Sequence, residues 1–309
     1  MSRQRSRLAD YAVYLVVRLL VCLIQALSLN AARKLSAGLA WLAYRIDRRH
    51  REVALDNLRK AYPGQFSDSA LDRMVCAVYQ HFCSVLVEII HLPRRLHPEN
   101  WRDHIELAGG RRMVDCLLSG RPLLIVTGHF GNWEMAGYAL GLLGFRTHAI
   151  ARTLDNPYLN AFLLKFREKT GQTILDKERD FQQIEAVLRS GGVLATLADQ
   201  DAGQRGVFVD FFGRPASTHR AVALLALEHG AAMAVTGTPR VAEPLRYRVI
   251  TEDILLPEDY ERDPNAMRAI TARYTAALER LIRAHPEQYL WLHRRWKHQP
   301  QAKKGKRAA

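Results

Sequence analysis

Short apolar stretches alternate with helical stretches from about residue 104 to residue 251, and this alternation limits the folds open to the chain. Strands that are separated by helices pair in parallel, so the pattern predicts an α/β fold with a mostly parallel sheet covered by helices. The predicted strands are 105–107, 122–128, 147–151, 173–175, 193–198, 207–212, 232–237 and 247–251. The predicted helices are 109–119, 132–143, 157–170, 180–190, 217–229 and 264–284.

The N-terminal stretch has a different composition, because residues 11–29 are almost entirely apolar. A bilayer span needs about 20 residues, so this stretch is just long enough, but Arg18 at its centre argues against an isolated span in lipid. One helical stripe holds Tyr11, Tyr14, Arg18, Gln25 and Ser28. Such a stripe indicates a face that docks on protein or contacts headgroups. We therefore expect residues 1–30 to be a membrane anchor that spans or lies in the interface; a buried core helix is the alternative.

The rest of the chain divides into three further segments. Residues 31–100 read as a helical region, with helices over 31–63 and 67–92. Residues 101–300 hold the strand–helix alternation, and residues 301–309 form a basic tail. More Lys and Arg follow the apolar stretch than precede it, and the positive-inside tendency places the main body on the cytoplasmic side.

The charge balance points to an anionic partner. The 309 residues include 45 Lys and Arg against 31 Asp and Glu, a net charge of +14. Nucleic acid, an anionic membrane, a phosphorylated ligand and an acidic protein would each suit this surplus. A nucleic-acid-binding protein is disfavoured, because the basic residues are scattered and form no recognised nucleic-acid motif. The four cysteines lack C-x-x-C spacing and read as reduced core residues.

The stretch VTGHFGNWE, residues 126–134, places a histidine directly after a predicted buried strand. Asn132 is a predicted helix cap, so His129 lies at a strand end and Glu134 in the first turn of the next helix. Open α/β sheets carry their chemistry at this edge. A neutral histidine oriented by a carboxylate is a general base, and this pair suits the activation of a hydroxyl group. We predict His129 and Glu134 as catalytic residues.

Polar residues also follow other predicted strands: Arg152, the acids Asp199 and Asp201, and Arg240. The carboxyl ends of parallel strands meet at one edge, so we expect these side chains near His129. The sequence has no G-x-S-x-G elbow, no phosphate-binding P-loop and no dinucleotide fingerprint. It also has no H-E-x-x-H pattern or Cys/His cluster, so we expect no metal and no bound cofactor.

Four segments together resemble the late lipid A acyltransferases and related bacterial lysophospholipid-type acyltransferases. These segments are VTGHFGNWE, RTLDNPYLN (152–160), ADQDAGQRGVFVDFFGRPAST (198–218) and PEQYLWLHRRWK (286–297). The first matches the family's H-x-x-x-x-D/E motif. The resemblance implies a glycerolipid acyltransferase-like fold at the cell inner membrane. It also implies transfer of a fatty acyl chain from acyl carrier protein or coenzyme A to a lipid hydroxyl without a covalent acyl-enzyme, and the acceptor that it favours is a lipid A precursor.

The same resemblance assigns roles to individual residues. His129 would remove the acceptor proton, and Glu134 would orient it and balance its charge. Arg152 and Arg167 would contact anionic headgroups or the donor, and the acids at 199 and 201 match the family's strand-end motif, so we group them with the substrate-binding residues. A phospholipid, an aminolipid or a mannosylated lipid as acceptor stays open, as does an acyl-thioester hydrolase that uses the same pair on water.

Overall fold

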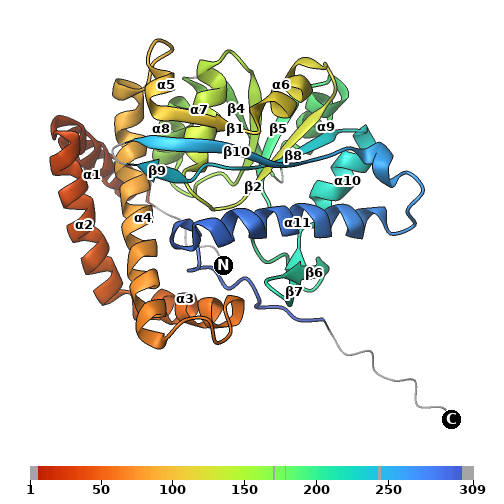
Figure 1. Ribbon diagram of the computed structural model, residues 1–309. Helices are drawn as coiled ribbons and strands as arrows, with labels where there is room; N and C mark the ends of the chain where they lie inside the picture. The colour runs from red at the N-terminus through yellow and green to blue at the C-terminus, as the bar shows by residue number, and fades with distance from the viewer. Residues whose placement is uncertain (1–5, 170, 178, 243–244, 301–309) are drawn as a thin grey trace.

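The computed structural model describes residues 6–300 except 170, 178, 243 and 244, and these residues form an 8-stranded sheet with helices on both faces (Figure 1). The strands are β1 Ile105–Ala108, β2 Leu123–Thr127, β3 Thr147–Ala151, β4 Gln172–Asp176, β5 Val193–Leu197, β8 Ala232–Gly237, β9 Arg240–Ala242 and β10 Arg246–Leu255. Their order is β1-β10-β8-β2-β5-β3-β4, with β9 paired to β10. The basic tail predicted at 301–309 lies outside the described residues.

The sheet is mostly parallel, as the strand–helix alternation predicts. Strands β8, β2, β5, β3 and β4 all run the same way, so their carboxyl ends share one edge. β10 is antiparallel to β8 because the short connection through β9 contains no crossover helix. The α/β fold class is therefore confirmed, with one reversed strand pair, β10 and β1, at an edge of the sheet.

The stretch 207–212 is a strand but does not join the main sheet. It forms β6 (Val207–Phe211), which pairs in an antiparallel hairpin with β7 (Arg214–Thr218). Phe212 and Gly213 connect them, and both have positive φ, as a two-residue hairpin turn requires. Residues 217 and 218, which were expected to begin a helix, end β7 instead.

Two sets of helices cover the two faces of the sheet. One face carries α9, α10 and α11, and the other carries α6, α7 and α8; Figure 1 shows α11 and α7 on opposite sides. The bounds are α6 Gly110–Leu118, α7 Trp133–Leu142, α8 Pro157–Glu168, α9 Phe181–Arg189, α10 Arg220–His229 and α11 Ala266–Ala284. In β2, Leu124 and Val126 pack toward α11, whereas Leu123 and Ile125 pack toward α6. Burial on both faces explains why this strand is a continuous apolar run.

Five helices precede or adjoin the first strand: α1 Arg7–Ala26, α2 Leu29–Ile46, α3 Arg48–Ala61, α4 Asp68–Arg95 and the single-turn α5 Trp101–His104. Side chains of Ser28, Asp47 and Ser67 cap the N-termini of α2, α3 and α4. Residues of α3 and α4 belong to the same hydrophobic core as one face of the sheet. The helical region and the α/β region thus share one core, and their separation at residue 100 stays a prediction.

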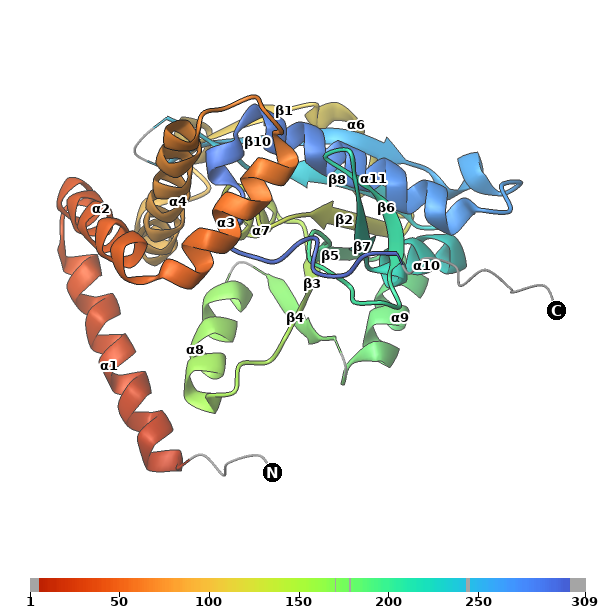
Figure 2. The ribbon, with the colours of Figure 1, turned by 90° about the horizontal axis from the view of Figure 1, so that it is seen from below.

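The polar stripe of α1 packs against other parts of the protein. Of the two roles expected for this face, docking on protein and contact with headgroups, the structure shows the first. Asn156 donates to the backbone oxygen of Asp10 at 2.8 Å, and Gln25 donates to the oxygen of Ile90 at 3.1 Å. The guanidinium of Arg18 lies 5.0 Å from the ring centre of Phe162 in α8, within cation–π range. Figure 2 shows α1 alongside α8 at the flank of the molecule.

The opposite face of α1 is apolar and exposed. The exposed apolar side chains of α1 and α2 include Leu8, Val13, Leu15, Val16, Leu19, Leu20, Leu23, Leu35, Leu39, Trp41, Leu42 and Ile46. By length and composition two described helices could cross a membrane, α1 and α4, but just over half of the apolar stretch of α4 is buried inside the protein. Soluble monomers rarely expose contiguous apolar surface of large extent, so the run of exposed apolar side chains on α1 and α2 indicates an interaction surface.

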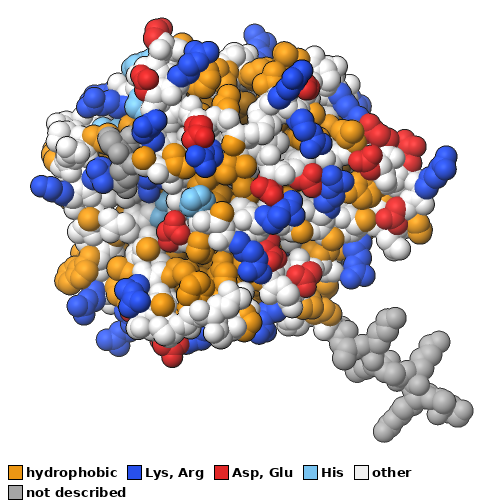
Figure 3. All heavy atoms as spheres, viewed as in Figure 1, with side chains coloured by type: hydrophobic (Ala, Val, Ile, Leu, Met, Phe, Trp, Pro, Cys, Tyr) orange, Lys and Arg blue, Asp and Glu red, His pale blue; other side chains and the backbone are white. Residues whose placement is uncertain are grey.

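Lys and Arg side chains are spread over the face seen in Figure 3, where they lie among acidic and apolar side chains. The net charge of +14 is therefore not gathered into a single basic stripe on this face.

Candidate active site

The loop between β2 and α7 is held in one conformation by its own sequence. Asn132 caps α7, since its side-chain oxygen accepts from the backbone N–H of Met135 at 3.0 Å. Gly131 has a φ of 61°, and a Cβ there would lie 2.0 Å from the backbone oxygen of Thr238. Only glycine fits both conditions. The backbone oxygen of His129 accepts from Leu290 at 3.0 Å, so the segment after α11 also holds this loop.

The carboxylate that contacts the His129 ring is Asp199. Its Oδ1 lies 2.9 Å from His129 Nδ1, and its Oδ2 accepts from the His129 backbone N–H at 2.9 Å. The sheet explains this contact: β2 and β5 are parallel neighbours with Thr127 opposite Leu197, so residues two places further along also lie opposite each other. The structure thus places Asp199, and not the predicted Glu134, against the ring, with each Asp199 oxygen in contact with His129, and a catalytic role of Glu134 stays a prediction.

The contact fixes the tautomer of His129. An ionised carboxylate only accepts hydrogen bonds, so Nδ1 carries the proton in the neutral ring. Nε2 then has a free lone pair and can accept a proton. Burial lowers the pKa of His129, but the charge and hydrogen bond of Asp199 together raise it more, so the pKa lies above its ordinary value. Burial raises the pKa of Asp199, and His129 outweighs this effect, so Asp199 stays ionised. The ring is 23% exposed and its edge contacts Trp133.

Glu134 forms an ion pair with Arg167 instead. Arg167 donates to both carboxylate oxygens, from Nε at 3.0 Å and from Nη2. The side chains are only 12% and 17% exposed, so the pair is largely withdrawn from solvent. A bidentate pair of this kind ties the first turn of α7 to the last turn of α8.

A narrow, mostly apolar cavity lies between α7 and the sheet, and the Glu134–Arg167 pair forms part of its wall. Trp133, which contacts the His129 ring, also lines it, so the cavity reaches the neighbourhood of the histidine. The other wall residues are Ile125, Thr127, Ala136, Gly137, Leu140, Thr147, Ala149, Ile150, Ala151, Gln172, Ala195, Thr196, Leu197 and Thr236. The small residues on β3 and β5 leave the space open.

The remaining predicted residues, Arg152 and Asp201, contact other partners. Arg152 is 85% exposed and pairs with Asp155, so its substrate-binding role stays a prediction. The Asp201 side chain is 6% exposed and holds the C-terminal segment: its Oδ2 lies 2.6 Å from His298 Nδ1, and the Asp201 N–H donates to His293 Nε2 at 2.9 Å. Both residues follow strands at the predicted edge, but neither contacts His129 or Glu134 through a hydrogen bond within the described part of the chain.

Residues 1–298, nearly the whole chain, match the family described as bacterial lipid A biosynthesis acyltransferase. The chain belongs to this family. The lipid A biosynthesis lauroyltransferase of Escherichia coli is 26% identical over 87% of this chain and 86% of that protein. The lipid A biosynthesis palmitoleoyltransferase of the same organism is 26% identical over 82% and 80%. The phosphatidylinositol mannoside acyltransferase of Mycobacterium tuberculosis is 29% identical, and this chain spans about half (54%) of its length.

This member of the lipid A acyltransferase family also has buried polar residues near the loop that the sequence reading missed. His81, Ser84, Glu88 and His91 recur every three or four residues in α4, and all four are buried. They form a polar stripe inside a helix otherwise recognised by its apolar residues. That spacing was the available signal, because a buried polar stripe must meet polar partners on a neighbouring element.

Proposed function

We propose that the chain transfers a fatty acyl chain from an acyl thioester, on acyl carrier protein or coenzyme A, to a hydroxyl group of a lipid A precursor. The observation that carries this proposal is the His129–Asp199 contact at the carboxyl edge of the sheet, in a chain that belongs to a lipid acyltransferase family. The basic balance of the chain suits these partners, since phosphorylated lipids, coenzyme A and an acidic carrier are all anionic.

In the proposed reaction, His129 Nε2 takes the proton from the acceptor hydroxyl while that oxygen attacks the thioester carbonyl carbon. The charge of Asp199 stabilises the imidazolium that forms. When the tetrahedral intermediate collapses, the carbon–sulfur bond breaks and the imidazolium returns the proton to the leaving thiolate. The products are the acylated lipid and a free thiol, and no acyl group becomes attached to the protein.

The cavity beneath α7 is the place we propose for the acyl chain. Its walls are largely apolar, and it reaches Trp133 beside the His129 ring, so an acyl chain inside it would present its carbonyl carbon near Nε2. The Glu134–Arg167 pair would hold α7 and α8 together around the chain, which gives Glu134 a role in substrate placement.

Ala149→Phe should fill this cavity and shift the donor preference toward shorter acyl chains. Ala149 lines the cavity from β3, and exclusion of even one methylene from an apolar pocket costs about 10- to 200-fold in kcat/KM. Release of free thiol from acyl-coenzyme A donors of increasing length measures the effect. Ala276→Phe, at an exposed position of α11, is the matched control. An unchanged chain-length profile for Ala149→Phe would place the acyl chain elsewhere.

The acceptor is the open part of the proposal. The mannoside acyltransferase relative keeps a mannosylated lipid as a second candidate. Free-thiol release is measured with a lauroyl thioester alone, with a lipid A precursor, and with a phosphatidylinositol mannoside, and mass spectrometry follows the lipid. Acylated lipid A precursor supports the proposal. Thiol release at the same rate with no lipid acceptor would instead indicate a thioester hydrolase.

We also propose that the exposed apolar faces of α1 and α2 rest in the cytoplasmic leaflet of the inner membrane. The polar stripe of α1 is occupied by α8, so the apolar face is the one left for lipid. Trp41 is 57% exposed beside Arg45, a pairing typical of the headgroup level.

Val16→Glu combined with Leu20→Glu should release the protein from membranes while its fold is kept. Both side chains lie on the exposed face of α1, where a carboxylate opposes insertion into lipid. Flotation with anionic phospholipid vesicles measures the bound fraction. Val114→Glu with Leu118→Glu makes the same change on exposed positions of α6 and should leave binding intact. Equal binding of both double variants would exclude α1 as the membrane contact.

A further inference from the structure

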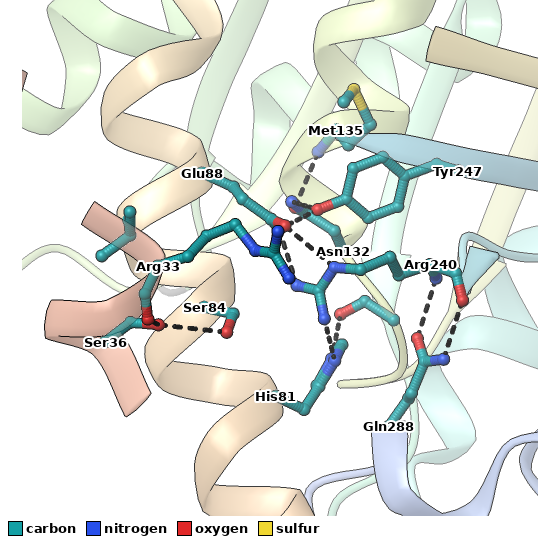
Figure 4. A network of polar contacts seen from close by, with 12 residues as sticks. Arg33, Ser36, His81, Ser84, Glu88, Asn132, Met135, Arg240, Tyr247 and Gln288 are labelled. Atoms are coloured by element: carbon teal, nitrogen blue, oxygen red, sulfur yellow. Dashed lines mark hydrogen bonds and ion pairs between the residues drawn. The ribbon is translucent and has the colours of Figure 1, made fainter. Parts of the chain in front are cut away.

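A buried polar network contacts residues 131 and 132 of the loop that carries His129 (Figure 4). Its centre is the carboxylate of Glu88 in α4, whose side chain is 4% exposed. Arg240 in β9 donates to both oxygens, from Nε at 2.8 Å and from Nη2 at 2.6 Å. Two buried charges are therefore matched by a bidentate contact between segments about 150 residues apart in sequence.

The network reaches the N-cap of α7 through one hydroxyl group. Tyr247 in β10 is fully buried and donates its hydroxyl proton to Glu88. The same hydroxyl oxygen accepts from the side-chain nitrogen of Asn132 at 3.0 Å. Asn132 is itself fully buried and caps α7, which starts at Trp133, four residues after His129. The orientation of this cap is thus set by Tyr247 and Glu88.

A second branch holds the neighbouring residue of the loop. His81 Nε2 lies 3.1 Å from the backbone oxygen of Gly131, and its Nδ1 lies 3.3 Å from Nη1 of Arg240. Because arginine only donates, Nδ1 must accept and Nε2 must donate to Gly131. Burial and the charge of Arg240 lower the pKa of His81 to about 3, which keeps this neutral tautomer at all ordinary pH values. Gln288 completes the branch by exchanging hydrogen bonds with the backbone of Arg240.

The branches end at Gly131 and Asn132, two and three residues after His129, and none of the network side chains lines the cavity beneath α7. A network that served only to join α4 to the sheet would not need hydrogen bonds to the 129–132 turn. The contacts constrain the turn from which the His129 side chain projects, and they add to the constraint that Asp199 applies to His129 itself.

We infer that Tyr247, Glu88, Arg240 and His81 are positioning residues that hold the 129–132 turn in the geometry in which His129 can take a proton from the acceptor. The inference rests on the proposed function of His129. A misplacement of about 1 Å at a reacting group can cost about 10²-fold in rate, so removing one of these bonds acts on kcat. Removing one of these bonds should leave substrate binding in the cavity unchanged, so kcat should fall while KM stays the same.

Tyr247→Phe removes the linking hydroxyl and keeps the ring. We expect kcat to fall about 10- to 100-fold while KM for the lauroyl thioester and for the lipid acceptor stays within about twofold. Tyr62→Phe is the matched control, because Tyr62 is also buried and its hydroxyl has no hydrogen-bond partner within the described chain. Rates are expressed per folded protein, with the thermal midpoint measured for each variant.

A second pair of variants covers the case in which Tyr247→Phe does not fold. His81→Gln keeps an N–H group that can donate to Gly131 and should retain most of the activity, whereas His81→Leu loses the bond and should lower kcat. Wild-type kcat in both Tyr247→Phe and His81→Leu, or equal losses in His81→Gln and His81→Leu, would overturn the inference. So would a change confined to KM, which would make the network a binding surface. His129→Ala is run in parallel, and its full activity would refute the proposed function itself.

Discussion

His129→Ala should lower the rate of acyl transfer by about 10²- to 10⁴-fold while the protein stays folded and membrane-bound. The substitution removes Nε2, the only atom we propose to take the acceptor proton. It also removes the hydrogen-bond donor that Asp199 Oδ1 has in the wild type. The measurement is formation of acylated lipid A precursor from a lauroyl thioester, with circular dichroism to confirm the fold.

His285→Ala is the matched control for this variant. His285 is partly exposed, follows α11 and has only a loose contact with Glu287, so its loss should leave the rate unchanged. A folded His129→Ala protein that still acylates lipid at near the wild-type rate would refute the general-base mechanism.

Asp199→Asn should have a comparable effect, a loss of about 10²-fold or more, for a different reason. The His129 backbone N–H requires an acceptor, so the amide oxygen would face it and the amide NH₂ would face Nδ1. A donor at that place forces the ring proton onto Nε2, the atom that must accept. The imidazolium also loses the charge that stabilises it.

The pH dependence of this variant provides a second measurement. In the wild type the rate should rise with pH as His129 loses its proton, at a pKa that Asp199 holds above the ordinary value. Without the Asp199 charge only burial acts on the ring, and burial lowers the pKa of His129. In the Asp199→Asn variant, the rise of the rate with pH should therefore occur at lower pH than in the wild type, and the maximal rate should be lower. Glu134→Gln, which changes the partner of Arg167, should leave the pH at which the rate rises unchanged. If this pH shifts in Glu134→Gln and not in Asp199→Asn, Glu134 is the residue that orients the ring.

The sequence was sufficient to place the histidine but not its carboxylate partner. An apolar run, a glycine and a capping asparagine locate His129 at a strand end by local rules alone. The partner depends on which strand lies beside β2, and strand order is a property of the whole chain. Glu134 was the nearest acid in sequence, whereas Asp199 is 70 residues away and is brought close by the β2–β5 pairing.

The same limit explains the other differences. The stretch 207–212 has strand composition, yet its partner is the adjacent β7 and not the main sheet, because positive φ values at Phe212 and Gly213 fold it back. The spacing of Glu88 within α4 marks it as one of several polar residues on a stripe, but only the approach of α4 to β10 shows that Tyr247 is its partner. Local signals thus predict elements and caps, while long-range pairing decides contacts.

The segment that follows α11 supplies bonds at two positions of the 129–132 turn: Leu290 donates to the backbone oxygen of His129, and the backbone oxygen of Gln288 accepts from Gly131 at 2.9 Å. During synthesis α1 therefore leaves the ribosome long before the turn can be completed. Under the proposed function, a nascent chain can reach the membrane through α1 while its histidine is still unsupported, and the proposed acyl transfer begins only after residues 286–298 have folded back onto the 129–131 turn.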